Sequence, residues 1–372
     1  MELNDELTRT IAERVTERPA PVPDLAGVRS RGRGLRRRRA GAVVAAVAVV
    51  SGGGLLIGQT IDTTTSQPER TERDPISGLD YSEGLRAFAS PDEDGEVSLG
   101  GQTFPRADMQ ELDTQATATP QGLLFYDREQ QVQLLAENGT VTALAPAPGP
   151  APASFRGSSK ADAQLPLVAF TQPGGEGFVN VLLHDLDAGR TVSTRQVPCE
   201  GRDCEAVVVD AVDRGLVFVR TGDGTYVWDP ERTGDASWTL LGDDRFRVAD
   251  AHGGAILWAD AAPDPAANSP VTDWRFIEGA IDAQLSFDGR HVLSWSPKLE
   301  PTTRADDPIM LDVDGAIWFT FDTDGSVLAA AQGGDGGDIG VFYDCEIPSG
   351  RCLKIGTMPT ISGDPMFIGD DM

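Results

Sequence analysis

The longest stretch of the sequence without a charged side chain runs from Ala40 to Ile61. Its 22 residues are mostly alanine, valine and glycine. As a helix they would extend about 33 Å, which matches the roughly 30 Å hydrocarbon core of a bilayer. The pattern therefore predicts one transmembrane helix over 40–61. A cleaved secretory signal and a buried core helix are the alternatives, although no Ala-x-Ala cleavage site follows the apolar core before Asp62.

A second pattern lies in residues 2–18, where Leu3, Leu7, Ile11 and Val15 recur every four positions among glutamates and arginines. This spacing predicts a short amphipathic helix, which the prolines at 19, 21 and 23 end. A helix of this kind either lies on the inner membrane surface or docks onto a cytoplasmic partner protein.

The remainder of the chain consists of two segments that differ in composition. Residues 62–78 lack apolar periodicity, which predicts a disordered linker. From Leu79 onward, short apolar runs alternate with Asp-Gly, Pro and Gly, which predicts an all-β domain over 79–372. The predicted strands include Gly122–Tyr126, Val132–Ala136, Leu167–Thr171, Val179–His184, Leu216–Arg220, Tyr226–Trp228, Ala255–Trp258, His291–Trp295, Ile317–Phe321, Val327–Ala331 and Gly340–Tyr343.

One hairpin signature repeats within this domain. An apolar run ends in aspartate, and a glycine follows four to six positions later. The aspartate can accept hydrogen bonds from turn amides, and the glycine can take a positive φ, so each copy predicts a hairpin. The copies are Asp185 with Gly189, Asp229 with Gly234, and Asp344 with Gly350.

A second repeated segment is Ser286-Phe287-Asp288-Gly289-Arg290, echoed by Asp322-Thr323-Asp324-Gly325-Ser326. It resembles the Ser-Pro-Asp-Gly-Arg hairpin of TolB-like and WD40-like β-propellers, with Phe287 in place of the usual proline. Corresponding strands at Leu85, Leu123, Leu167, Leu216, Ala255, Val292 and Val327 are spaced by 38, 44, 49, 39, 37 and 35 residues. A four-stranded blade needs about 40–45 residues, so about seven blades fit best. Six or eight blades, or a pair of β-sandwiches, are the alternatives.

The charge distribution predicts the orientation in the membrane. Residues 1–40 carry ten arginines and six acids, a net charge of +4; subtracting this from −27 for the whole chain leaves −31 for residues 62–372. Arginine favours the cytoplasmic side of a span, so we expect residues 1–39 inside and 62–372 outside. The acidic exterior argues against nucleic acid or anionic lipid as a partner, because both bind positive surfaces.

The order of segments in the first sixty residues also resembles that of a known class of membrane protein. A short helix, a proline-rich hinge, four arginines (Arg36 to Arg39) and an Ala/Val/Gly span resemble single-pass membrane proteins of high-GC Gram-positive bacteria, an actinobacterial type. Some proteins of this layout lie beside extracytoplasmic sigma factors, which implies a regulatory role. The His-x3-Cys-x2-Cys zinc motif of many anti-sigma domains does not occur, since the first cysteine is Cys199.

The four cysteines form two local pairs, Cys199 with Cys204 and Cys345 with Cys352. Their expected position outside the membrane favours disulfides. Free buried thiols are the alternative. Metal binding is disfavoured because zinc sites use Cys-x2-Cys spacing or nearby histidines.

Motifs that would identify an enzyme or a metal site are not found. Asp-Gly tracts such as Asp312–Gly315 lack the closing glutamate of a twelve-residue calcium loop. No Gly-x-Ser-x-Gly elbow, phosphate loop or His-Glu-x-x-His motif occurs, and the histidines are only His184, His252 and His291. We therefore expect no catalytic residue, metal or cofactor.

Two predicted loops, Ala259–Asp273 and Ser296–Pro308, exceed ordinary hairpin length. The second contains Lys298 and Arg304, rare cations in an acidic domain, which makes it a candidate ligand loop or a solvated loop with internal ion pairs. Tryptophans in predicted strands are expected in the blade core; these are Trp228, Trp258, Trp295 and Trp318.

The sequence as a whole predicts a membrane-anchored extracytoplasmic β-propeller that acts as a binding or scaffolding module for an unknown ligand. A transmembrane regulator, sensor or anti-sigma-like, whose residues 1–18 hold a cytoplasmic partner, is the second hypothesis. A propeller hydrolase or lyase is the third.

Overall fold

A computed structural model describes residues 84–89, 96–105, 109, 116–149, 155–199, 201–259, 269–271, 273–280, 282–313, 315–332, 339–359 and 366–367. All of them belong to one compact unit, Thr71–Met372. The predicted amphipathic helix 2–18, transmembrane helix 40–61 and linker 62–78 lie outside these residues. In the part of the chain that is described, no helix is long and apolar enough to cross a bilayer.

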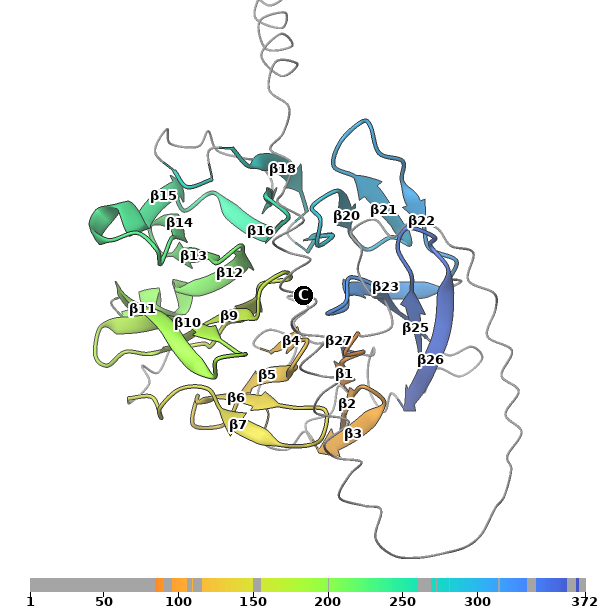
Figure 1. The fold of residues 1–372 in the computed structure, drawn as a ribbon, viewed down its shortest axis with the longest axis horizontal. Coiled ribbons are helices and arrows are strands. Elements are labelled where there is room, and N and C mark those ends of the chain that lie inside the picture. Colours follow the sequence, from red (N-terminus) through yellow and green to blue (C-terminus); the bar gives the residue numbers. More distant parts are fainter. Residues whose placement is uncertain are drawn as a thin grey trace, which may run out of the picture. The chain divides into compact units, whose positions relative to one another are not determined.

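The described strands form seven sheets arranged around a common axis (Figure 1). We call the sheets blades 1 to 7 and give each from its innermost strand outward. Blade 1 is β27 (Met366–Phe367), β1 (Phe88–Ala89), β2 (Glu96–Leu99) and β3 (Gln102–Pro105); blade 2 is β4 (Thr117–Thr119), β5 (Gly122–Tyr126), β6 (Val132–Leu135) and β7 (Val141–Ala143); blade 3 is β8 (Ser159–Ala161), β9 (Leu167–Pro173), β10 (Phe178–Asp185) and β11 (Arg190–Pro198).

Blade 4 is β12 (Val208–Asp213), β13 (Leu216–Thr221), β14 (Gly224–Trp228) and β15 (Trp238–Gly242); blade 5 is β16 (Arg247–His252), β17 (Ala255–Ala259) and β18 (Arg275–Gly279); blade 6 is β19 (Gln284–Leu285), β20 (His291–Leu293), β21 (Lys298–Pro301) and β22 (Ile309–Met310); blade 7 is β23 (Ala316–Phe321), β24 (Val327–Gln332), β25 (Ile339–Cys345) and β26 (Cys352–Pro359). Two short 3-10 helices, Gly201–Ala206 and Gly234–Ser237, complete the elements. This arrangement confirms the predicted all-β, seven-bladed β-propeller.

The apolar runs that most clearly predicted strands correspond to the second strands of the blades. Every residue of β5 and β17 is buried, because both faces of these strands pack against neighbouring blades. One core cluster joins β9, β10 and β13, and another joins β13, β16 and β17. A strand buried on both faces is apolar at consecutive positions rather than at alternate ones.

The ring closes between the two ends of the domain. β27 pairs with β1 in antiparallel register, with Phe88 opposite Phe367 and Ala89 opposite Met366. Blade 7 packs against the same strand, since the rings of Phe88 and Phe342 stack with centroids 4.0 Å apart. Arg86, two residues before β1, pairs with Asp344 of β25 at 2.8 Å. Blade 1 is therefore completed by a strand from the far end of the chain.

The repeated turn signatures fall at equivalent places. The three Asp-to-Gly hairpins join the third and fourth strands of blades 3, 4 and 7, and Gly189, Gly234 and Gly350 have φ of 61°, 65° and 70°. Asp185 and Asp229 accept hydrogen bonds from turn amides as predicted, whereas Asp344 pairs with Arg86 instead.

The sequence spacing also located the blades. Six of the seven residues aligned by spacing lie in the second strand of a blade, and the seventh, Leu85, lies three residues before β1. The predicted disulfides Cys199–Cys204 and Cys345–Cys352 are both present.

Two local expectations were wrong. The segment Ser296–Pro308 is not one loop, because Lys298–Pro301 forms β21 and pairs with β20. Trp295 is 49% exposed and lies after the end of β20, so it is outside the blade core. Blade 5 also departs from the regular pattern, since β18 runs parallel to β17.

Candidate functional site

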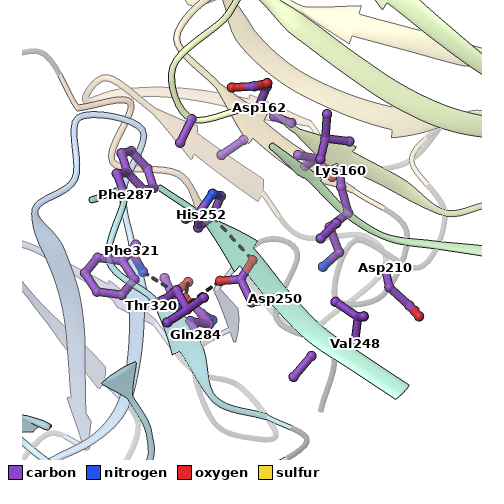
Figure 2. A pocket seen from close by; sticks show the side chains of 18 of the residues that line it. Lys160, Asp162, Asp210, Val248, Asp250, His252, Gln284, Phe287, Thr320 and Phe321 are labelled. Atoms are coloured by element: carbon purple, nitrogen blue, oxygen red, sulfur yellow. Dashed lines mark hydrogen bonds and ion pairs between the residues drawn. The ribbon is translucent and has the colours of Figure 1, made fainter. Parts of the chain in front are cut away.

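A cavity of about 160 Å³ lies where the innermost strands face one another. Its walls come from β4, β8, β12, β16, β19 and β23, the first strands of blades 2 to 7, together with the turns that follow several of them. Hereafter it is called the central cavity. Figure 2 shows side chains from different blades converging on it.

Small side chains border this space. The alanines that line the central cavity are Ala118, Ala161, Ala163, Ala211, Ala249 and Ala283. All of them except Ala163 pack against the apolar clusters between blades, and Ala163 lies in the turn after β8. A larger side chain at position 163 would therefore enter the cavity.

Three rings form one side of the central cavity. His252 ends β16, Phe287 lies in the turn after β19, and Phe321 ends β23. The ring centroids of His252 and Phe287 are 5.3 Å apart, and those of Phe287 and Phe321 are 6.2 Å apart. We call these three residues the aromatic wall. Because the rings touch one another, they present a continuous surface rather than separate contacts.

Asp250 lies beside the aromatic wall. Its Oδ1 is 3.4 Å from Nε2 of His252 and accepts a 2.7 Å hydrogen bond from the amide of Ala251. Its Oδ2 accepts a 2.7 Å hydrogen bond from the amide of Leu285 in the next blade. The carboxylate is thus fixed in position by backbone donors from two blades.

Polar groups continue around the central cavity. Gln284 Oε1 accepts hydrogen bonds from the Thr320 hydroxyl and the Phe321 amide, both at 3.1 Å. Lys160 of β8 reaches in from the side opposite the aromatic wall (Figure 2). Asp210 of β12 pairs with Arg220 at 3.3 Å.

The turns between the first and second strands carry a set of buried carboxylates that join successive blades. Asp162 accepts from the Gly215 amide at 2.9 Å, Asp213 from the Gly254 amide at 3.0 Å, and Asp322 from the Arg86 amide at 2.8 Å. We call these three residues the blade-joining aspartates. They fix the rim of the central cavity.

Burial raises the pKa of all three blade-joining aspartates above the usual value. The pKa of Asp213 rises to about 6, mainly through burial, against the opposing effect of nearby His252. The pKa of Asp322 rises to about 7, because burial is reinforced by the charges of Asp324 and Asp344. Removing a carboxylate from water disfavours its charged form.

The residues singled out from the sequence lie elsewhere. Lys298 is in β21 and pairs with Glu300 at 2.6 Å, and Arg304 is exposed in the segment after β21. Neither lines the central cavity. Their role in ligand binding stays a prediction. Among the described residues, no group of three or more His, Cys, Asp or Glu side chains is placed to hold a metal ion.

The sequence contains one feature of the central cavity that can be recognised without the structure. Phe287 departs from the Ser-Pro-Asp-Gly-Arg hairpin, and it belongs to the aromatic wall. His252 ends β16, and no feature of the sequence links it to Asp250 or Phe321. The phenylalanine at position 287, where the hairpin usually has proline, is the one sequence feature that could have indicated this site.

Comparison with family models and with curated proteins finds no match. Solved structures with a similar fold include a chain of the mitotic checkpoint complex, with 9% identity, a TM-score of 0.34, and coverage of 69% of this chain and 83% of that one. PorZ, a surface component of the type-IX secretion system of Porphyromonas gingivalis, has 11% identity and a TM-score of 0.38 over 76% of this chain and 39% of PorZ. BamB from Moraxella catarrhalis has 14% identity and a TM-score of 0.31 over 68% of this chain and 89% of BamB. At this distance the likenesses concern the fold alone.

Proposed function

We propose that this chain is a membrane-anchored binding module whose ligand occupies the central cavity. The observation that carries the proposal is the cavity itself, because polar groups from six blades converge with an aromatic wall around an open space. Ligand sites in proteins are typically concave and largely apolar, with a few fixed polar groups. Asp250, Gln284 and Thr320 supply such groups here.

The membrane anchor in this proposal is supported by the sequence alone. The uncharged segment 40–61 and the arginines before it favour a single span with the propeller outside the cell. The proposal assigns binding and not catalysis, since no catalytic motif occurs in the sequence.

A small-molecule screen of the purified full-length chain, followed by isothermal titration of the compounds that bind, tests the proposed site. Ala163 lines the central cavity and is half-buried, so Ala163→Phe should obstruct the cavity and weaken binding at least tenfold. Ala143 is exposed on β7, and Ala143→Phe is the matched control that should leave the affinity unchanged.

Two results would contradict the proposal. One is a ligand that binds Ala163→Phe as tightly as the natural chain. The other is a ligand that is recovered chemically altered after incubation, which would favour an enzyme.

A second function, a transmembrane regulator, is supported by the apolar periodicity of residues 2–18. In that case Leu3, Leu7, Ile11 and Val15 bind a cytoplasmic protein, with a sigma factor as the expected partner class. A pull-down with residues 1–40 should recover such a partner, and Leu7→Glu should abolish the recovery.

A further inference from the structure

We infer that the ligand of the central cavity carries a small quaternary alkylammonium group, which lies against the aromatic wall. This inference rests on the proposed function and adds the chemical class of the ligand. Three observations on the described residues carry it: the ring surface, the balance of charge around the cavity, and the way in which Asp250 is already hydrogen-bonded.

The aromatic rings provide the surface that the cationic group of the ligand would contact. Phe287 and Phe321 both line the central cavity and are half-buried, so part of each ring remains accessible from it. The face of an aromatic ring carries negative electrostatic potential, and a cation within about 6 Å of the ring centroid is attracted to it. Because Phe287 contacts both Phe321 and His252, the surface is continuous and suits a compact group with several methyl or methylene substituents.

The charges around the central cavity also favour a cationic ligand. Five aspartates line the central cavity, namely Asp162, Asp210, Asp250, Asp282 and Asp322, against one lysine and one arginine. Asp210 pairs with Arg220, and burial raises the pKa of Asp162 and Asp322, so the negative charge offered to a ligand rests mainly on Asp250 and Asp282. Arg247 begins β16 and His252 ends it, which separates them by roughly 15 Å at the rise of a β-strand. Lys160 enters from the side opposite the rings (Figure 2). The two cations that line the cavity thus lie away from the aromatic wall, whereas the guanidinium of Arg275 donates to the Gly289 carbonyl in the turn that carries Phe287.

The bonding of Asp250 favours a quaternary ammonium ion over a cation with N–H donors. Both carboxylate oxygens already accept backbone N–H groups at 2.7 Å, and Oδ1 also lies 3.4 Å from His252. A carboxylate fixed in this way attracts positive charge without needing to accept another hydrogen bond. A quaternary ammonium group has spread charge and no N–H donors, so it matches this surface.

Isothermal titration of the full-length chain with choline and with 3,3-dimethylbutan-1-ol tests the inference. The alcohol has the shape of choline but no charge. We expect choline to bind with a dissociation constant of about 1 mM or tighter, and at least tenfold more tightly than the alcohol.

The location is tested by Phe287→Leu and Phe321→Leu, which keep the side chains apolar but remove the rings. Each should weaken choline binding by about 3- to 30-fold, with little effect on binding of the alcohol. Phe178 is an exposed phenylalanine on β10, and Phe178→Leu is the matched control that should leave both affinities unchanged. Circular dichroism confirms that each variant is folded.

Three results would overturn the inference: equal affinity for choline and the alcohol, no binding of choline at 10 mM, or choline binding that neither ring variant weakens. If choline fails while another compound binds and is excluded by Ala163→Phe, the alkylammonium class is wrong and the proposed site stands. If no compound is sensitive to Ala163→Phe, the proposed function itself fails.

Discussion

The most unusual residues of this propeller are the carboxylates buried at its turns. Asp322 is 2% exposed and lies near Asp324 and Asp344, with Arg86 as the cation on this side. Its Oδ2 accepts from the Arg86 amide and its Oδ1 from the Thr323 amide. Protonation of one of these three carboxylates reduces the electrostatic repulsion among them and so stabilises the folded state.

The pKa of Asp322 gives a prediction about stability and pH. The folded pKa is about 7 and the usual value is 3.8, so the folded state binds more protons between these two values. The contribution of Asp322 to the free energy of unfolding should therefore be full below about pH 4 and should fall as the pH rises towards 7. Asp322→Asn, which carries no charge, should make the free energy of unfolding less dependent on pH over this window.

Urea unfolding at pH 5 and at pH 7.5 measures this effect. Asp235 is exposed, and Asp235→Asn serves as the control. If Asp322→Asn and the natural chain lose the same stability between the two pH values, the buried carboxylate is not responsible.

At the scale of elements, the sequence pattern predicted the second and third strands of most blades but few of the first strands. β4, β8, β12 and β16 were all missed. They line the central cavity and contain alanine, and β12 and β16 also contain aspartate; both residue types have low strand propensity. The first strands, which line the central cavity, are thus the strands with the weakest apolar pattern in the sequence.

The closing strand β27 should contribute to the stability of the whole ring. Deleting residues 366–372 removes the strand that pairs with β1 and leaves blade 1 without its inner strand. We expect a lower melting temperature and a less cooperative transition than in a chain that lacks only residues 368–372. Differential scanning calorimetry compares the two truncations, and identical transitions would argue against this mode of closure.

The disulfide Cys345–Cys352 joins a directly opposite pair in the β25–β26 hairpin. Its loop is short, so the loss of chain entropy that it imposes on the unfolded state is small. Replacing both cysteines by alanine should lower the free energy of unfolding by about 2–3 kcal/mol. Urea unfolding of this double variant measures the loss, and unchanged stability would show that the bridge is dispensable.

At the scale of the whole molecule, the central cavity exists only because the ring brings distant residues together. Lys160, Asp250 and Phe321 line one space although 161 positions separate the first from the last. Short-range patterns reveal hairpins and their repetition, which is why the blade number could be predicted. They carry no information about which side chains meet across the axis.

The predicted orientation of the whole chain is tested by reporter fusions. A reporter that is active only outside the cytoplasm should work when it is fused after Met372 and should fail when it is fused before Arg36, because the arginines at 36–39 favour the cytoplasmic side. Opposite activities would reverse the orientation. Release of the propeller without its span would favour a cleaved signal.

A crystal structure of the chain with the tightest compound from the screen shows directly whether the ligand binds in the central cavity. We expect ligand density there, in contact with Phe287 or Phe321 and beside Asp250. Density at the outer strands or in the segment with Lys298 and Arg304, with the central cavity empty, would contradict this expectation.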